Sequence, residues 1–99
     1  MFSLFFIQAT LLVSAAFYDC SSELANLRSD TDAYTKIKQA YDEKFKFSST
    51  CLEILLRKNF FSAGEFLMNE YYPKTSIDTE IIVRNVANEI KRNQDYLVF

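Results

Sequence analysis

Residues 20–59 read CSSELANLRSDTDAYTKIKQAYDEKFKFSSTCLEILLRKN. This stretch contains neither glycine nor proline, the two residues that most strongly disfavour a helix interior. Apolar side chains recur along it in steps of three, four or seven residues, the spacing typical of one buried helical stripe. These side chains are Leu24, Leu27, Tyr34, Ile37, Tyr41, Phe45, Leu52 and Leu55. The stretch therefore predicts helical structure.

The two cysteines of the chain, Cys20 and Cys51, constrain how that helical structure is divided. One unbroken helix would hold them about 46 Å apart, whereas a disulfide needs Cα atoms within about 7 Å. Ser29, followed by acidic residues, has the character of an N-cap. An internal disulfide therefore predicts a partly unwound arm, residues 20–29, running back along a helix of residues 30–47. The alternatives are a bond between two chains, which would give a homodimer, or two separate thiols.

A polar cluster at residues 48–50 marks the next division of the chain. Thr50 with Glu53 three residues later has the pattern of a capping box, which starts a helix. The alternative is a first helix that continues through the cluster. We favour a break there.

A second capping box, Ser62 with Glu65, predicts the start of a further helix. Phe61 and Phe66 are spaced to form a hydrophobic staple around this start. The helix is expected to stop before Pro73, because proline disfavours helical geometry in the residue that precedes it.

The last helix is predicted to begin after Thr75 and Ser76, which are good capping residues. Its residues separate into an apolar and a polar face. The apolar face contains Ile82, Val83, Val86, Ala87, Ile90 and Leu97. The apolar end of the chain, residues 96–99, is expected to dock on the core. Taken together, the elements predict an all-α fold, a small bundle of three or four helices.

The first residues have the features of a signal peptide, with an apolar run from Phe2 to Val13 followed by small residues. Cleavage is expected after Ala15 or Ala16. We therefore predict a signal peptide over residues 1–16 and a secreted helical domain over residues 17–99, with no stable membrane insertion after cleavage. An oxidising compartment suits a structural disulfide.

Composition argues against several classes of function. The chain has a formal charge of -2, which is not the basic balance typical of nucleic-acid-binding proteins. The lysines of residues 36–46 alternate with Asp42 and Glu43, so they are interpreted as a solvated helix face. The chain has no histidine, which excludes hydrolase triads with a histidine base and histidine metal sites. We expect no cofactor, no metal and no enzyme activity.

The leading hypothesis is a secreted binding or effector protein that acts on an extracellular protein partner. Phe60, Tyr71 and Tyr72 are the candidate contact residues, because aromatic side chains at helix ends and in loops often remain uncovered.

Two alternatives remain. One is a carrier of a small apolar ligand held between helices. Its predicted cavity would be lined by Phe45, Leu55, Phe66 and Ile90. The other is a peptide precursor cut at two dibasic pairs, residues 57–58 and 91–92. Those pairs are Arg57 with Lys58 and Lys91 with Arg92.

Overall fold

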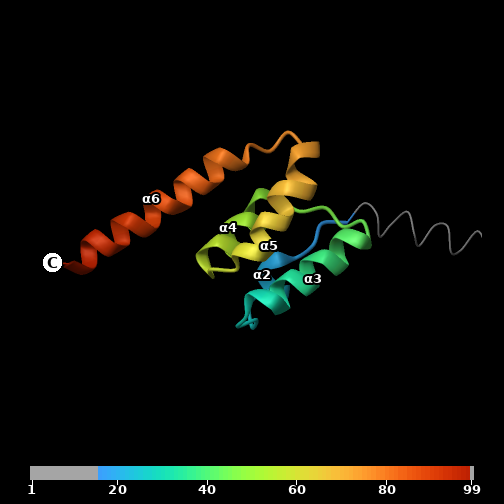
Figure 1. Cartoon of the computed structure of the whole chain (residues 1–99), viewed down its shortest axis with the longest axis horizontal. Helices are drawn as coiled ribbons and strands as arrows, with labels where there is room; N and C mark the ends of the chain where they lie inside the picture. The colour runs from blue at the N-terminus through green and yellow to red at the C-terminus, as the bar shows by residue number, and fades with distance from the viewer. Residues whose placement is uncertain (1–15, 99) are drawn as a thin grey trace, which may run out of the picture.

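The computed structural model describes residues 16–98, and for residues 94–98 it describes the backbone. Helix α5 packs against both α3 and α4, while α2 and α6 each pack on α4 (Figure 1). The elements are α2 (Cys20–Glu23), α3 (Asp30–Asp42), α4 (Ser49–Arg57), α5 (Phe61–Phe66), the π-helical turn η1 (Leu67–Tyr71), the 3-10 turn η2 (Tyr72–Lys74) and α6 (Thr79–Val98). The predicted small all-α bundle is confirmed.

The predicted signal peptide covers residues 1–16, and residues 1–15 lie outside the described part of the chain. Signal cleavage therefore stays a prediction. Between residues 16 and 98, no helix has both the length and the apolar character needed to cross a membrane.

A disulfide between Cys20 and Cys51 joins the N-terminal arm to α4, with the two Cα atoms 5.4 Å apart. The bond forms within one chain, which decides between the alternatives that the sequence left open. The arm is partly unwound, as predicted: α2 ends at Glu23, and residues 24–29 form a turn and an irregular segment.

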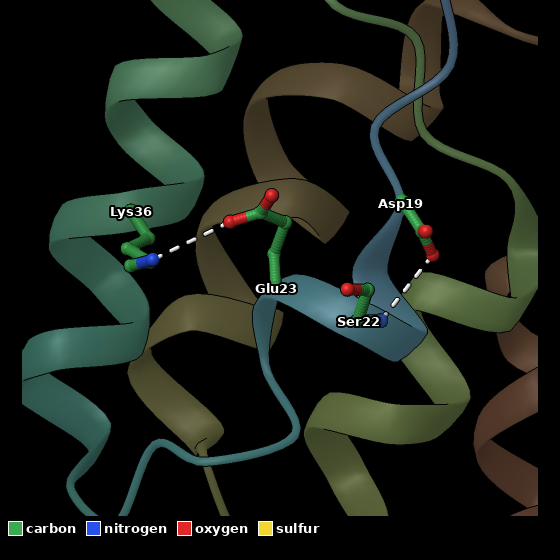
Figure 2. A network of polar contacts seen from close by, with 4 residues as sticks. All are labelled: Asp19, Ser22, Glu23 and Lys36. Atoms are coloured by element: carbon green, nitrogen blue, oxygen red, sulfur yellow. Dashed lines mark hydrogen bonds and ion pairs between the residues drawn. The ribbon is translucent and has the colours of Figure 1, made fainter.

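Two polar contacts hold the arm in place (Figure 2). The Asp19 carboxylate caps α2 by accepting a hydrogen bond from the Ser22 N–H at 3.3 Å. The Glu23 carboxylate forms an ion pair of 3.4 Å with Lys36 of α3. The arm is thus tied to α3 on one side and, through the disulfide, to α4 on the other.

Helix α3 begins as predicted and ends earlier. The Ser29 side chain accepts a hydrogen bond from the Asp32 N–H at 3.1 Å, so the predicted N-cap is confirmed. The helix ends at Asp42 and not at residue 47. A non-local contact follows this end: the Lys46 N–H donates to the Ala16 carbonyl at 2.9 Å in an isolated parallel bridge, which requires extended backbone.

The break before α4 is confirmed, but neither predicted capping box forms. Helix α4 begins at Ser49, one residue before Thr50, and has no side-chain cap. Helix α5 begins at Phe61, and its neighbour Ser62 makes no cap either. The predicted staple fails too, because the Phe61 side chain is exposed.

The cap of α5 comes from another helix. The Asp30 carboxylate, at the start of α3, accepts hydrogen bonds from the Ser62 N–H at 3.0 and 3.1 Å and from the Ala63 N–H at 3.2 Å. Burial raises the pKa of Asp30, but hydrogen bonds from the Ser62 side chain and from the Ser62 and Ala63 N–H groups outweigh it and hold the pKa below its ordinary value. The contact therefore stabilises the packing of α3 on α5.

We expect Asp30→Ala to lower the free energy of unfolding by about 1 kcal/mol, the usual cost of losing a helix cap. Asp30→Asn is the matched control, because asparagine caps nearly as well without charge. Since the folded-state pKa is lowered, the contribution of the Asp30 charge is present above the unfolded pKa, near 4, and is lost as pH falls through the folded pKa. Urea denaturation between pH 2 and 7 measures both effects, and equal stability of the alanine variant and the wild type would contradict the assignment.

Gly64 of α5 faces three leucines of α4. It is buried, and a methyl group placed on it would lie 3.5 Å from Leu52 Cδ1 and 3.7 Å from Leu56 Cδ2. Both distances are ordinary van der Waals contacts, so the site has room for one methyl group and no more.

Gly64→Ala is therefore expected to raise the free energy of unfolding by about 0.5 to 1 kcal/mol, because alanine loses less backbone entropy on folding than glycine does. Gly64→Val serves as the size control and should cost about 1 to 3 kcal/mol through overpacking. Thermal denaturation followed by circular dichroism ranks the three proteins. A destabilised alanine variant would show that the helices lie closer together than described.

The helix that follows changes form before Pro73. The α-helical bonding gives way to the π-helical turn η1, in which the Tyr72 N–H donates to the Leu67 carbonyl. Proline has no N–H and its ring crowds the preceding turn, so regular α-helical bonding cannot continue through it. The α-helix therefore ends before Pro73 as predicted, but the chain continues through the π-helical turn η1 and the 3-10 turn η2.

Helix α6 is attached through its first half. The Asp78 carboxylate accepts a hydrogen bond from the Glu80 N–H at 3.0 Å, so Asp78 takes the capping role predicted for Thr75 and Ser76. Ile82 and Val86 are buried, and α6 packs on α4. The second half runs away from the other helices (Figure 1). The predicted docking of residues 96–99 concerns side chains outside the described part.

Candidate functional site

An open groove of about 400 Å³ lies between the end of α3 and the turns η1 and η2. Its lining combines three aromatic side chains, all half-buried, with three exposed lysines. The lining residues are Tyr41, Phe45, Tyr71, Lys44, Lys46, Lys74, Glu70 and Thr75. We call this the lysine–aromatic groove. A surface of this kind can bind a ligand that has both an apolar part and negative charge.

The aromatic wall is fixed from behind by the core. The Tyr71 ring packs edge-on against Phe47 at 5.1 Å and against Tyr72 at 5.3 Å, measured between ring centroids. The Tyr71 hydroxyl accepts a hydrogen bond from the Phe47 N–H at 3.1 Å. Phe45 in turn packs edge-on against Tyr18 at 5.6 Å. Two of the three aromatic rings of the groove, Phe45 and Tyr71, are thus each held by a second ring.

Tyr72 is the buried support of this wall. Its side chain is 1% exposed, and its hydroxyl donates a hydrogen bond to the Ser48 carbonyl at 2.6 Å. Burial raises the pKa of Tyr72 far above its ordinary value. The phenol therefore remains neutral and holds η2 against the start of α4.

Lys44 occupies a position at which lysine is unusual. The Lys44 N–H donates to the Tyr41 carbonyl and the Phe45 N–H to the Ala40 carbonyl, both at 3.0 Å, which is the hydrogen-bond pattern of a Schellman motif ending α3. The residue in the left-handed position of this motif is normally glycine or asparagine. Here it is Lys44, with φ of 69°.

The end of α4 provides an internal comparison for Lys44. The same pair of hydrogen bonds recurs there, from Asn59 to Leu56 and from Phe60 to Leu55. Its left-handed residue is Asn59, with φ of 63°, which is a residue type that tolerates this conformation. The chain thus uses a favourable residue at one helix end and a strained lysine at the other.

Lys46 is fixed by the N-terminal segment. Its N–H donates to the Ala16 carbonyl at 2.9 Å, and its carbonyl accepts from the Tyr18 N–H at 2.8 Å. Its Nζ lies 5.8 Å from the centre of the Phe17 ring, within cation–π range. Phe17 is 64% exposed, so a further aromatic surface lies next to the groove.

The groove lysines form no ion pair within the described part of the chain. The ion pairs described for residues 16–93 involve Lys36, Lys38, Arg57 and Arg84, and none of the three groove lysines. One carboxylate, that of Glu70, lines the groove. The lysines are therefore available to an anionic ligand, on a chain whose formal net charge is -2.

The three aromatic residues predicted to contact a partner have different environments. Tyr71 is half-buried and lines the groove. The prediction that Phe60 and Tyr72 stay uncovered is wrong, because the two side chains are 4% and 1% exposed. Phe60 follows the α4 cap and turns into the core, while the hydroxyl of Tyr72 has a partner inside the fold. Position in a loop or at a helix end did not decide exposure.

The four residues predicted to line an apolar cavity do not form one. Leu55 is fully buried in the core, and Ile90 is 39% exposed on α6. Phe45 lines the lysine–aromatic groove, whereas Phe66 lines a separate groove beside Ser62 and Asn69. No shared cavity is thus formed by this set.

The first dibasic pair lies at the end of α4 and the second within α6. Arg57 ends α4 and forms an ion pair of 2.7 Å with Glu89 of α6, and the Lys58 Nζ donates to the Ala25 carbonyl at 3.2 Å. Lys91 and Arg92 are exposed within α6.

Sequence reasoning missed the groove lysines because it placed them wrongly. Lys44 and Lys46 were interpreted as part of a solvated helix face, but α3 ends at Asp42 and both residues follow it. Lys74 comes from a segment distant in sequence. A possible sequence signal was the alternation of lysine and phenylalanine at residues 44–47, which fits an extended segment better than a helix.

Comparison of the chain with protein-family models, with curated proteins and with solved structures finds no match. Within the described residues, no three side chains of His, Cys, Asp or Glu gather closely enough to hold a metal ion. The fold and the groove define the class as a disulfide-crosslinked helical domain with an open, lysine-lined aromatic surface.

Proposed function

We propose that this protein is a secreted, non-enzymatic binding protein that acts on an extracellular protein partner through the lysine–aromatic groove. The observation that carries the proposal is the half-buried wall of Tyr41, Phe45 and Tyr71 beside three lysines that form no ion pair with any described residue. Aromatic side chains of this kind supply much of the binding energy in protein interfaces.

Secretion is supported by two separate features. The apolar N-terminal run with its small residues is typical of a signal peptide. The disulfide between Cys20 and Cys51 suits an oxidising compartment. The domain that would be exported contains both cysteines and the whole groove.

The open shape of the groove favours a protein partner over a carried small molecule. Sites for small apolar ligands enclose most of the ligand surface. The groove is instead a shallow surface with charged rims, and Leu55, predicted to line an internal cavity, is packed in the core. A segment of a protein can lie across such a surface and make further contacts outside it.

Site-specific photo-crosslinking tests the proposal. The crosslinking amino acid is placed at Lys74, on the groove, and in a matched variant at Ile81, which is exposed on α6. Each purified protein is irradiated in extracellular fluid of the source organism. We expect one extracellular protein to be captured from position 74, to be displaced by excess unmodified protein, and not to be captured from position 81.

Three outcomes would overturn the proposal. They are a chain that stays inside the cell when expressed in a secretory host, the absence of any displaceable adduct at position 74, and identical adducts from both positions. The intact mass of the exported product also shows where the signal peptide is removed.

A further inference from the structure

We propose that the segment recognised by the groove is acidic, with Asp or Glu side chains next to one large apolar or aromatic side chain. This inference rests on the proposed function, because it names the chemistry of the partner. The groove would bind a stretch of the partner whose carboxylates contact the three lysines and whose apolar side chain packs against Tyr41, Phe45 and Tyr71.

The charge arrangement is the first argument. The groove has three lysines and one glutamate on a chain that is acidic as a whole. Exposed cations elsewhere are partly neutralised, as with Lys36 by Glu23 and Lys38 by Asp42. The lysines at the groove have no such partners among the described residues, and all three line one surface, so a carboxylate-rich segment is attracted there.

The backbone of Lys44 is the second, independent argument. A side chain with a Cβ is strained at positive φ, and glycine at this position would relieve that strain. The chain keeps a lysine at φ of 69° although the equivalent place after α4 has the more suitable Asn59. Strain of this kind is concentrated at functional sites. The ammonium group that Lys44 brings to the groove is a reason for the lysine.

The aromatic wall is the third argument, because it distinguishes a peptide from a plain polyanion. Tyr41, Phe45 and Tyr71 present half-buried rings, and Phe17 beside Lys46 is largely exposed. A polyanion such as nucleic acid or an anionic membrane is attracted by net positive charge, which this chain does not have. An acidic segment with an apolar anchor uses both halves of the groove.

The test is an NMR titration of the full secreted chain with three defined probes. The first probe is an octapeptide with one phenylalanine flanked by glutamates, and the second has every glutamate replaced by glutamine. The third is an oligothymidylate of eight nucleotides. We expect amide shifts confined to the groove with the acidic peptide, at least tenfold weaker binding of the glutamine peptide, and weakening of the acidic peptide with added salt.

Two groups of variants link the affinity to the lysines. The triple variant Lys44→Gln, Lys46→Gln, Lys74→Gln should bind the acidic peptide at least about tenfold more weakly, since each exposed charge contact contributes a small factor. The matched control removes the same charge elsewhere, with Arg28→Gln, Lys91→Gln and Arg92→Gln, and should bind within twofold of the wild type.

Lys44→Gly is expected to raise thermal stability and to weaken binding of the acidic peptide. Relief of the strained φ should raise Tm by about 2 to 6 °C, while the loss of one ammonium group should weaken acidic-peptide binding by about two- to fivefold. A purely structural role for Lys44 would leave binding unchanged.

The outcomes separate this inference from the proposed function. Equal groove binding of the glutamate and glutamine peptides would overturn acidic selectivity while leaving a protein-binding groove. Equal binding of the oligonucleotide, or an equal loss of affinity in the control triple variant, would also overturn the inference. Loss of the displaceable crosslink at position 74 would overturn the proposed function itself.

Discussion

Replacement of Cys20 and Cys51 together by alanine is expected to lower the free energy of unfolding by about 3 to 4 kcal/mol, because the unfolded chain regains the loop entropy that the crosslink removes. The bond joins residues separated by 31 positions. A small domain has a total stability of about 5 to 15 kcal/mol, so the loss is large. Alanine is preferable to serine here, because both cysteines are buried and serine would bury two hydroxyl groups.

The measurement is urea denaturation of the wild type and the double alanine variant, followed by circular dichroism. Wild-type protein denatured with and without a thiol reductant is the control, since reduction removes the bond without changing the side chains. A loss below 1 kcal/mol in both comparisons would contradict the stabilisation expected from the loop entropy of the unfolded chain.

The second large effect is expected at Tyr72. Tyr72→Ala should cost about 3 to 5 kcal/mol, because it removes an aromatic side chain that is 1% exposed and leaves a cavity. Tyr72→Phe should cost about 1 kcal/mol, since it keeps the ring and loses the hydrogen bond to the Ser48 carbonyl. Thermal and urea denaturation give both values, and a phenylalanine variant as unstable as the alanine variant would contradict this division.

Tyr72 also predicts a pH dependence. Burial raises its pKa in the folded state above the ordinary value of 10. A raised folded-state pKa contributes stability that is fully present below the unfolded pKa and is lost as pH rises through the folded pKa. Wild-type stability should therefore fall above pH 10, more steeply than that of Tyr72→Phe, which lacks the phenol.

Local sequence patterns predicted the helices well and their capping poorly. The spacing of apolar residues identified the helical segments. Ser29 was found as a cap because the N–H group that it accepts from, that of Asp32, lies only three residues later in the sequence. The cap of α5 could not be found in this way. Asp30 lies 32 residues from Ser62, and only the packing of α3 on α5 brings them together.

The groove depended on the same kind of non-local contact. The end of α3 is followed by a bridge between Lys46 and Phe17 of the N-terminal segment, and no glycine or proline announces it. Lys74 then reaches the same surface from the far side of Pro73. Tyr71 was predicted as a contact residue and does line the groove, whereas the burial of its neighbour Tyr72 depends on the carbonyl of Ser48.

The outward course of α6 has a practical consequence. The buried side chains among residues 79–93, Ile82 and Val86, lie in the first half of α6, and the end of the helix is on the opposite side of the molecule from the end of α3 (Figure 1). A tag, dye or surface anchor attached at this end of the chain would thus lie far from the three groove lysines. A protein immobilised through this end would expose the lysine–aromatic groove to solution, so the C-terminal end is a suitable attachment site for biosensor measurements.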